Sequence, residues 1–364
     1  MKREVLTIRD VYNVCRKKES EGLRVVNAHI GAPSHPPPMP ISTALRRIWD
    51  VGLDYLPYQG MSSVRERVAE YVERFSGRKL EVDRIFLTNG GTHGLTTVLL
   101  ALRGSEVLLP APGFPPYYYY SDFIEIRFRT YDPLKGIEGI LESLTPKTRA
   151  VLINYPNNPT GYYPPSDELV DLWEKLKDRG VLLINDSAYS QIYYEERPEL
   201  VGDVIIDTFS KVFAVPGLRL GYVYWEAPEL ERLSRAVYIT STGISEVSQL
   251  LLMYLIYACT SDYLESVRYN YKLKRDALAE RLSEAGFEFP EPRGAIYLFV
   301  THDKVKDSNE LTKSLLSRKD VVVGVVPGEN FRAGAEWFRI SYGKLNRGDI
   351  DLMAEVLKEE VSKL

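Results

Sequence analysis

The chain has 364 residues, of which 45% are hydrophobic and 26% charged, an ordinary composition for a globular protein of about two domains. Its formal net charge of −4 provides no overall basic field for a nucleic-acid partner. Its two cysteines and four histidines are too few and too far apart for a disulfide framework or a zinc site. We therefore expect no bound metal and no nucleic acid.

The N-terminal segment mixes charged with apolar residues and lacks the uninterrupted apolar run of a signal peptide. Val5, Ile8 and Val11 recur at helical spacing, which predicts a short amphipathic helix. The longest apolar run, residues 250–259, is too short to span a bilayer and predicts a buried core helix. We expect a soluble, cytoplasmic protein with no membrane partner.

Apolar strand patterns and amphipathic helix patterns alternate through the middle of the chain. Most of the strand patterns are continuous apolar runs, which is typical of strands buried on both faces of a parallel sheet. This alternation predicts an α/β fold with a mostly parallel sheet covered by helices. The predicted helices are 62–75, 92–102 and 165–179, and the predicted strands are 85–87, 107–109, 150–154, 181–185, 204–209 and 221–224.

The pattern changes after residue 260. A long charged helix over 262–285 precedes strands over 295–300, 321–326 and 337–341, a combination that predicts a smaller α+β unit. The Pro-rich segment 33–40 separates the N-terminal helix from the main body, so we expect that helix to pack with the C-terminal unit. The predicted domains are a large one over 41–260 and a small one built from both chain ends, 1–40 and 261–364.

Several short motifs follow predicted strands, at the edge where an open α/β sheet places its ligand. Segment 88–94 has glycines where a helix begins, which favours either an anion site or a plain tight turn. Segment 157–161 (NNPTG) is a turn by composition. Asp186 ends a strand three residues before Tyr189, and such an aspartate either pairs with a protonated ring nitrogen or caps a helix.

Lys211 lies where a strand gives way to a loop, eight residues before Arg219. A lysine in such a place can form a Schiff base with an aldehyde cofactor. The hydroxyls of Thr208 and Ser210, together with the arginine, suit a phosphate. A Ser-Lys pair taken alone is also common in solvated loops, so the motif gains weight only from its neighbours.

The order and spacing of these motifs resemble the class I/II aminotransferases of pyridoxal-phosphate fold type I, over residues 31–339. The most specific pieces are SKVF at 210–213 and GLRLGY at 217–222, supported by DSAY at 186–189 and FRIS at 338–341. The resemblance implies a large, mostly parallel sheet of the seven-stranded type with a smaller α+β domain. It also implies ping-pong transfer of an amino group between an L-amino acid and a 2-oxo acid, with 2-oxoglutarate as the expected acceptor.

The resemblance assigns a role to each motif residue. Lys211 would hold pyridoxal 5'-phosphate and carry the α-proton, Asp186 would pair with the pyridine nitrogen, and Tyr189 would contact the phenolic oxygen of the ring. Phe114 would stack on the ring. The other implied cofactor contacts within the subunit are Gly91, Thr92, Asn158, Thr208, Ser210 and Arg219.

The substrate contacts implied by the same resemblance are few. Arg339 would grip the α-carboxylate, with Gly31 and Asn158 beside it. Tyr55 would reach the phosphate bound by the neighbouring subunit, which implies a homodimer with shared active sites. Thr92 stands where some aspartate-preferring members carry a lysine, which argues against an aspartate specialist. Another basic residue, for example from the partner subunit, could replace that lysine, so recognition of a dicarboxylate stays open.

Three further features favour structural interpretations. We interpret the tyrosine run 117–120 as a helix face packed against the sheet rather than an aromatic substrate wall, His93 as structural, and the basic cluster 272–275 as a solvated helix face. The motifs leave open a pyridoxal-phosphate carbon–sulfur β-lyase of the same fold. A non-catalytic, cofactor-binding regulator is a more remote alternative.

Overall fold

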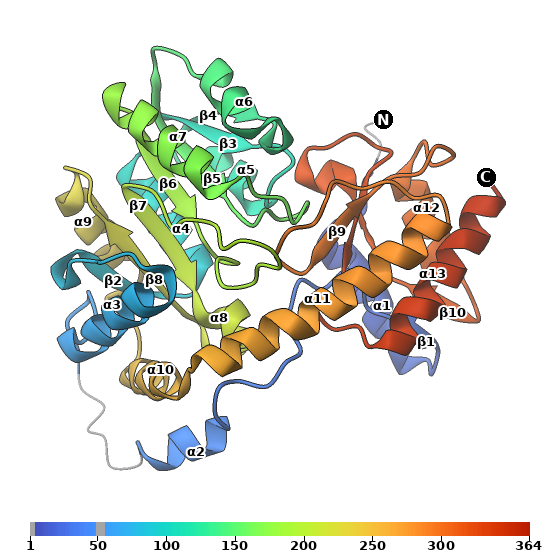
Figure 1. Ribbon diagram of the computed structural model, residues 1–364, viewed down its shortest axis with the longest axis horizontal. Helices are drawn as coiled ribbons and strands as arrows, with labels where there is room; N and C mark the ends of the chain where they lie inside the picture. The colour runs from blue at the N-terminus through green and yellow to red at the C-terminus, as the bar shows by residue number, and fades with distance from the viewer. Residues whose placement is uncertain (1–3, 49–54) are drawn as a thin grey trace.

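The computed structural model describes residues 4–48 and 55–364; residues 1–3 and 49–54, which fall within the two predicted domains, lie outside the described residues. The largest sheet in this part of the chain has seven strands in the order β2-β8-β7-β6-β5-β3-β4 (Figure 1). β8 is antiparallel to both of its neighbours, and the other pairs are parallel, which confirms the predicted mostly parallel α/β fold. The strands are β2 (Ile85–Asn89), β3 (Glu106–Pro110), β4 (Arg127–Tyr131), β5 (Thr148–Asn154), β6 (Leu182–Asp186), β7 (Val204–Thr208) and β8 (Leu220–Trp225).

Helices cover both faces of this sheet (Figure 1). Successive side chains of β8 point to opposite faces of the sheet and are buried on both. Tyr222 and Tyr224 pack with α3 and α10 on one face, and Val223 and Trp225 pack with α4 and α9 on the other. Burial on both faces requires the continuous apolar strands seen in the sequence. The helices of this unit are α2 (Ile41–Arg46), α3 (Ser62–Ser76), α4 (Gly91–Ala101), α5 (Pro116–Tyr119), α6 (Gly136–Ser143), α7 (Ser166–Asp178), α8 (Phe209–Val212), α9 (Leu230–Ser241) and α10 (Glu246–Ala258).

A smaller unit joins the two ends of the chain (Figure 1). β9 (Tyr297–Val300), β11 (Val326–Pro327) and β12 (Phe338–Ser341) form an antiparallel sheet, and β1 (Arg24–Val26) pairs in parallel with β10 (Val321–Val323). As predicted, the N-terminal helix packs here, since Val11 and Cys15 share a buried cluster with Leu316 and Val322. The domain boundaries stay a prediction. The helices of this unit are α1 (Ile8–Ser20), α11 (Ser261–Glu284), α12 (Ser308–Ser317) and α13 (Arg347–Ser362).

Apart from the strand over 321–326, the bounds of the predicted strands differ from the observed ones by one or two residues, and two of the differences have a clear physical cause. The single strand expected over 321–326 is wrong, because the chain leaves one sheet after β10 and enters another at β11. Gly324 lies at the crossing, where a Cβ would come within 2.5 Å of His29 Nδ1. The strand expected over 204–209 ends at Thr208, because the Thr208 side chain accepts a hydrogen bond from the Ser210 backbone and caps α8.

No single helix among residues 4–48 and 55–364 is long and apolar enough to cross a membrane. α9 and α10 reach the required length and composition only as a pair, across a bend of 117°. α10 covers most of the apolar run 250–259, and it buries Leu251, Leu252 and Leu255 against the sheet and α2, as predicted for a core helix.

Candidate active site

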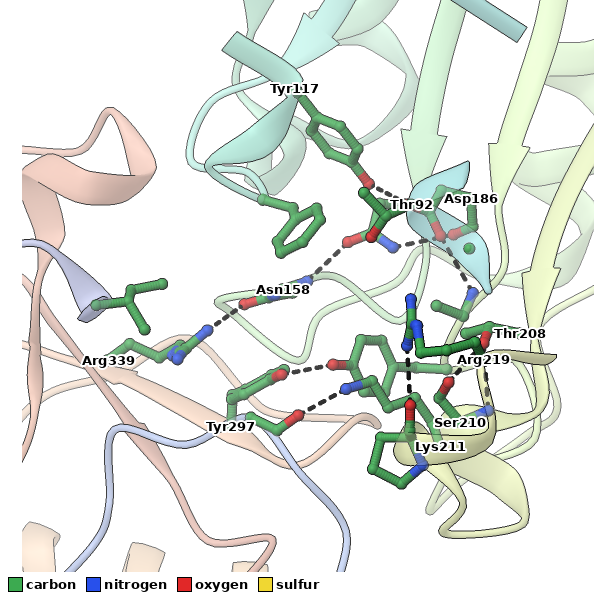
Figure 2. A pocket seen from close by; sticks show the side chains of 18 residues that line it. Thr92, Tyr117, Asn158, Asp186, Thr208, Ser210, Lys211, Arg219, Tyr297 and Arg339 are labelled. Carbon is green, nitrogen blue, oxygen red and sulfur yellow. Dashed lines mark hydrogen bonds between the residues drawn. The ribbon is translucent and has the colours of Figure 1, made fainter. Parts of the chain in front are cut away.

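The predicted motifs meet at one edge of the large sheet. β2, β3, β5, β6 and β7 all run in the same direction, so their carboxyl ends share this edge with the start of β8. A pocket of about 270 Å³ lies there (Figure 2). The predicted site residues that line it are Gly31, Gly91, Thr92, Phe114, Asn158, Asp186, Tyr189, Thr208, Ser210, Lys211, Arg219 and Arg339. Tyr55 is the predicted residue that does not line it, and its side chain is 97% exposed.

One end of the pocket gathers donors that suit an oxyanion. α4 begins here behind Gly90, whose φ of +80° is easy only for glycine, and a Cβ at Gly90 would come within 2.6 Å of Arg219 Nη2. The Thr208 and Ser210 hydroxyls lie 2.9 Å apart, and the Thr208 hydroxyl donates to the Leu220 carbonyl at 2.9 Å. The unpaired backbone N–H groups of the first helical turn, two hydroxyls and a guanidinium thus converge on one place, an arrangement that binds phosphate well.

Asp186 lies at the end of β6 and is held by a tyrosine. Its Oδ2 accepts a hydrogen bond from the Tyr117 hydroxyl at 2.6 Å, and its Oδ1 accepts one from the Ala188 backbone at 3.3 Å. Burial raises the pKa of the Asp186 carboxyl, and the bond from Tyr117 opposes that rise. A buried carboxylate of this kind is stabilised by a cation that arrives with a ligand.

The tyrosine run 117–120 is therefore only partly a packed helix face. Tyr118 fits that interpretation, since its hydroxyl donates to the Pro110 carbonyl at 2.6 Å in the core. Tyr117 lines the pocket and contacts Asp186 instead, so it is a site residue that the sequence interpretation missed.

Lys211 lies in α8 with its amine inside the pocket. Its Nζ donates to the Gly31 carbonyl at 2.6 Å (Figure 2). Burial, helped by the positive charges of Arg339 and Arg219, lowers the pKa of Lys211 to about 8, while Asp186 acts in the opposite direction. At neutral pH this lysine is therefore unprotonated more often than an ordinary one, and the unprotonated amine is the form that attacks an aldehyde.

Arg339 lies on β12 and is buried at the opposite end of the pocket from the oxyanion donors (Figure 2). Its Nη1 donates to Asn158 Oδ1 at 3.0 Å and its Nη2 to the His29 carbonyl at 2.8 Å. Its buried Nε has no hydrogen-bond partner among residues 4–48 and 55–364. Both acceptors are uncharged, so the guanidinium charge is not neutralised by them, which suits a substrate carboxylate.

Other lining residues were not predicted. The Tyr297 hydroxyl lies 2.5 Å from the Tyr189 hydroxyl, and its ring lies 4.5 Å from the Arg339 guanidinium. Asn154 donates to the Asp186 carbonyl at 2.9 Å, and Ile8 reaches the pocket from α1. Asn154 ends a predicted strand, a position that signals this edge, whereas Tyr297 and Ile8 carry no such signal.

His93 has the structural role that we predicted. Its Nδ1 accepts a hydrogen bond from the Asn89 backbone at 3.1 Å, and its Nε2 lies 2.9 Å from the Thr240 hydroxyl. The side chain links α4 to α9 and is not among the residues that line the pocket.

These residues fit a phosphorylated pyridine aldehyde. The Asp186 carboxylate suits a protonated ring nitrogen, the donors around Thr208 and Arg219 suit a phosphate, and Lys211 supplies an amine of lowered pKa. The unpartnered Nε of Arg339 leaves a cation for the carboxylate of a second molecule. The pocket therefore has groups for both a cofactor and an amino acid.

Comparison with known proteins gives a consistent result. Residues 47–357 match the family described as aminotransferase class I and II. The chain is 28% identical over 374 residues to a probable aspartate aminotransferase of Methanocaldococcus jannaschii, covering 97% of this chain and 96% of that protein. It is 29% identical to aromatic-amino-acid aminotransferase 2 of Thermococcus litoralis, covering 92% of each.

The fold has a close counterpart among solved structures. Aspartate aminotransferase from Thermus thermophilus with maleate superposes with a TM-score of 0.88 at 24% identity, covering 99% of this chain and 97% of that one. At this identity the likeness concerns the fold, and it confirms the predicted fold class. The names of the similar proteins cover both aspartate and aromatic donors, so they do not fix the donor of this chain.

Proposed function

The chain belongs to the class I and II aminotransferases, and on that premise we propose that it moves an amino group between an L-amino acid and a 2-oxo acid with pyridoxal 5'-phosphate bound at Lys211. The family uses this cofactor and acts on amino acids and 2-oxo acids. One observation carries the proposal: a single pocket holds the Lys211 amine, whose pKa is lowered to about 8, and the unneutralised Arg339.

The cofactor, when bound, supplies an aldehyde that captures amines and a ring that withdraws electrons from the substrate α-carbon. We assign the ring nitrogen to Asp186, the ring face to Phe114, and the phenolic oxygen to Asn158 and Tyr189. The phosphate contacts that we assign are Gly91, Thr92, Thr208, Ser210 and Arg219.

Three residues of the pocket would hold or move protons and orient the substrate. Asp186, supported by the Tyr117 hydroxyl, keeps a proton on the ring nitrogen. The Lys211 amine would act as the base that takes the proton from the substrate α-carbon and as the acid that gives it back. Arg339 holds the α-carboxylate and so orients the α-carbon toward Lys211.

We propose that the donor has an uncharged, preferably aromatic, side chain. The pocket has aromatic and aliphatic lining residues: the Tyr297 ring lies 4.5 Å from the Arg339 guanidinium, and Ile8 and Phe114 line the same pocket. Among the described lining residues, the cations are already assigned to other tasks, and Thr92 provides no charge for a distal carboxylate. The second carboxylate of the proposed acceptor, 2-oxoglutarate, would have to be met by the partner subunit, so the preference for an uncharged donor rests on the apolar lining and not on a missing cation.

We propose a homodimer in which Tyr55 reaches the neighbouring site. Its 97% exposure, together with its absence from the pocket of its own chain, supports this placement. Sedimentation of the purified protein tests it. A fully active monomer would contradict the shared site.

The test of function is the absorbance spectrum of the cofactor-loaded protein, recorded with single L-amino acids and no acceptor. We expect the bound aldehyde form to convert to the amine form with aromatic donors, faster than with aspartate, and no conversion in Lys211→Ala. Release of pyruvate and ammonia from a cysteine conjugate without conversion would support the β-lyase instead. A protein that gains no cofactor band would contradict the whole assignment.

A further inference from the structure

A group of residues outside the pocket holds the chain directly after Lys211. The Val212 carbonyl accepts a hydrogen bond from His35 Nε2 at 3.0 Å and lies 3.0 Å from the Tyr263 hydroxyl, whose single proton it shares with the Pro36 carbonyl at 3.1 Å. Val212 is the last residue of α8, the four-residue helix that carries Lys211. The last carbonyls of a helix have no partner within the helix, so these two donors fill a real requirement. We call His35 and Tyr263 the carbonyl clamp.

The hydrogen bonds define the protonation of His35. The Val212 carbonyl can only accept, so His35 Nε2 carries the hydrogen. Nδ1 lies 2.8 Å from the Tyr271 hydroxyl, which already accepts the Ser34 backbone N–H at 3.0 Å and so has its own proton to donate. Burial lowers the pKa of His35, the hydrogen bond to the Val212 carbonyl opposes this change, and the Lys274 ammonium on α11 adds to it.

The segment that carries His35 also contacts the lysine amine. Gly31, four residues earlier, accepts the hydrogen bond from Lys211 Nζ at 2.6 Å. The same stretch of chain therefore holds both the amine of Lys211 and the end of its helix. Tyr263 ties this arrangement to α11, the long helix that runs from beside α10 to the small unit (Figure 1).

We propose that His35 is a positioning residue for Lys211: by holding the Val212 carbonyl, it keeps the lysine amine at its buried place beside Gly31. The inference rests on the role of Lys211 in the proposed function. It adds a residue from a segment that contributes Gly31 to the pocket but was otherwise interpreted as a Pro-rich connection.

Competitive amine labelling of the cofactor-free protein over a range of pH tests this proposal, because it reports the pKa of Lys211 itself. In His35→Gln the side-chain nitrogen can occupy the place of Nε2 and donate to Val212, so we expect a pKa near that of the wild type. In His35→Asn the side chain is shorter, so its amide nitrogen lies near the position of His35 Nδ1 and cannot reach the Val212 carbonyl. We expect the Lys211 pKa to rise by about one unit toward its ordinary value, because the amine becomes better solvated.

Tyr263→Phe removes the second donor at nearly constant volume, and we expect a smaller rise in the same direction. Equal shifts in the Gln and Asn variants, or no shift in a folded Asn variant, would overturn the proposal. If the Asn variant does not fold, Tyr263→Phe decides, and an unchanged Lys211 pKa in it would count against the clamp. The labelling uses no cofactor, so its failure is distinct from failure of the proposed function, which the donor spectra test.

Discussion

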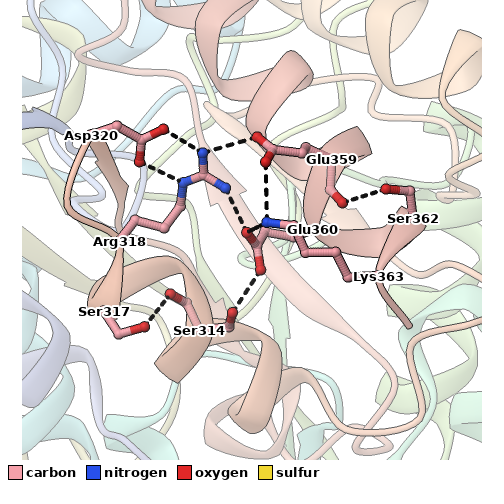
Figure 3. A network of polar contacts seen from close by, with 8 residues as sticks. All are labelled: Ser314, Ser317, Arg318, Asp320, Glu359, Glu360, Ser362 and Lys363. Atoms are coloured by element: carbon pink, nitrogen blue, oxygen red, sulfur yellow. Dashed lines mark hydrogen bonds and ion pairs between the residues drawn. The ribbon is translucent and has the colours of Figure 1, made fainter.

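The pocket and an ion cluster at the C-terminal end of the small unit both contain several charged groups, but only in the cluster is each charge paired with an opposite one. In the cluster, Arg318 donates to Asp320 at 3.0 and 2.6 Å, to Glu359 at 2.9 Å and to Glu360 at 2.5 Å (Figure 3). Lys363 adds a second cation, 2.7 Å from Glu360. Every charge there has an opposite charge in contact.

The pKa directions show the difference. Arg318 lowers the pKa of Asp320 to about 2 and also lowers that of Glu359, so the folded cluster favours the charged forms and contributes stability. In the pocket, burial raises the pKa of Asp186 and lowers that of Lys211, so the fold disfavours their charged forms. The ion cluster therefore stabilises the folded protein, whereas the buried charged groups of the pocket destabilise it until a ligand of opposite charge binds to them.

The largest effect is expected for Lys211→Met. We expect loss of transamination by about 10⁴-fold or more, since cofactor attachment and proton transfer both need the amine. The cofactor-free variant should be more stable than the wild type below pH 8. Between pH 8 and 10.5 the Lys211 amine is protonated in the unfolded wild type but not in the folded one, because folding lowers its pKa from 10.5 to about 8. The free energy of unfolding of the wild type should therefore increase with pH over this range, relative to that of the variant. Urea unfolding over this pH range measures both, and a pH-independent difference would contradict the desolvated lysine.

Arg339→Lys should come next. A lysine cannot donate two parallel hydrogen bonds to a carboxylate, so kcat/KM for amino-acid donors should fall about 100-fold. The matched control is Arg332→Lys, because the Arg332 guanidinium packs on Tyr118, 4.7 Å from its ring, and does not line the pocket. Steady-state kinetics on both variants decides. Equal losses would show that Arg339 acts only through packing.

Tyr117→Phe should weaken cofactor binding about tenfold. The change removes a hydrogen bond to a charged carboxylate and leaves Asp186 harder to ionise. Tyr118→Phe is the control, since its hydroxyl bonds to backbone rather than to Asp186. Cofactor titration followed by absorbance gives both dissociation constants. Identical constants for Tyr117→Phe and the wild type would remove Tyr117 from the site.

Arg318→Met should have the smallest effect, about 1–2 kcal/mol less stability at neutral pH with unchanged kinetics. The carboxylates it pairs with have lowered pKa values, so their contribution is present above their ordinary values and lost as the pH falls toward 2. The stability difference between wild type and variant should therefore fade on acidification. Thermal unfolding at several pH values measures this, and a difference that persists in acid would mean that packing dominates.

The sequence predicts much of the site because its motifs follow buried parallel strands, whose carboxyl ends necessarily meet. Asp186, Thr208 and Asn158 fall together for that reason. Tyr117 was missed because α5 has only four residues, and one turn shows no period from which a facing direction can be read. β4 was missed because it is an edge strand whose side chains are mostly exposed, so it lacks the apolar pattern of its neighbours.

The small unit was less predictable for a related reason. Segment 321–326 divides between two sheets because β10 pairs with β1 and β11 pairs with β12, and at Gly324, between them, a Cβ would come within 2.5 Å of His29 Nδ1. Both the pairing with β1 and the contact with His29 join segments far apart in sequence. His35 lies in a Pro-rich stretch with no periodicity, and its partners lie on α8 and α11. Local patterns carry no information about such distant neighbours.

The pairing of the two chain ends determines the order in which parts of the pocket can fold during synthesis. Arg339 donates to the His29 carbonyl, 310 residues earlier in the chain, and β1 must wait for β10 before it can pair. On the ribosome, the sheet strands from Ile85 to Trp225 emerge long before β12 does. The side of the pocket formed by Gly31 and Arg339 is therefore assembled last, and a nascent chain has its lysine helix long before it can grip a substrate carboxylate.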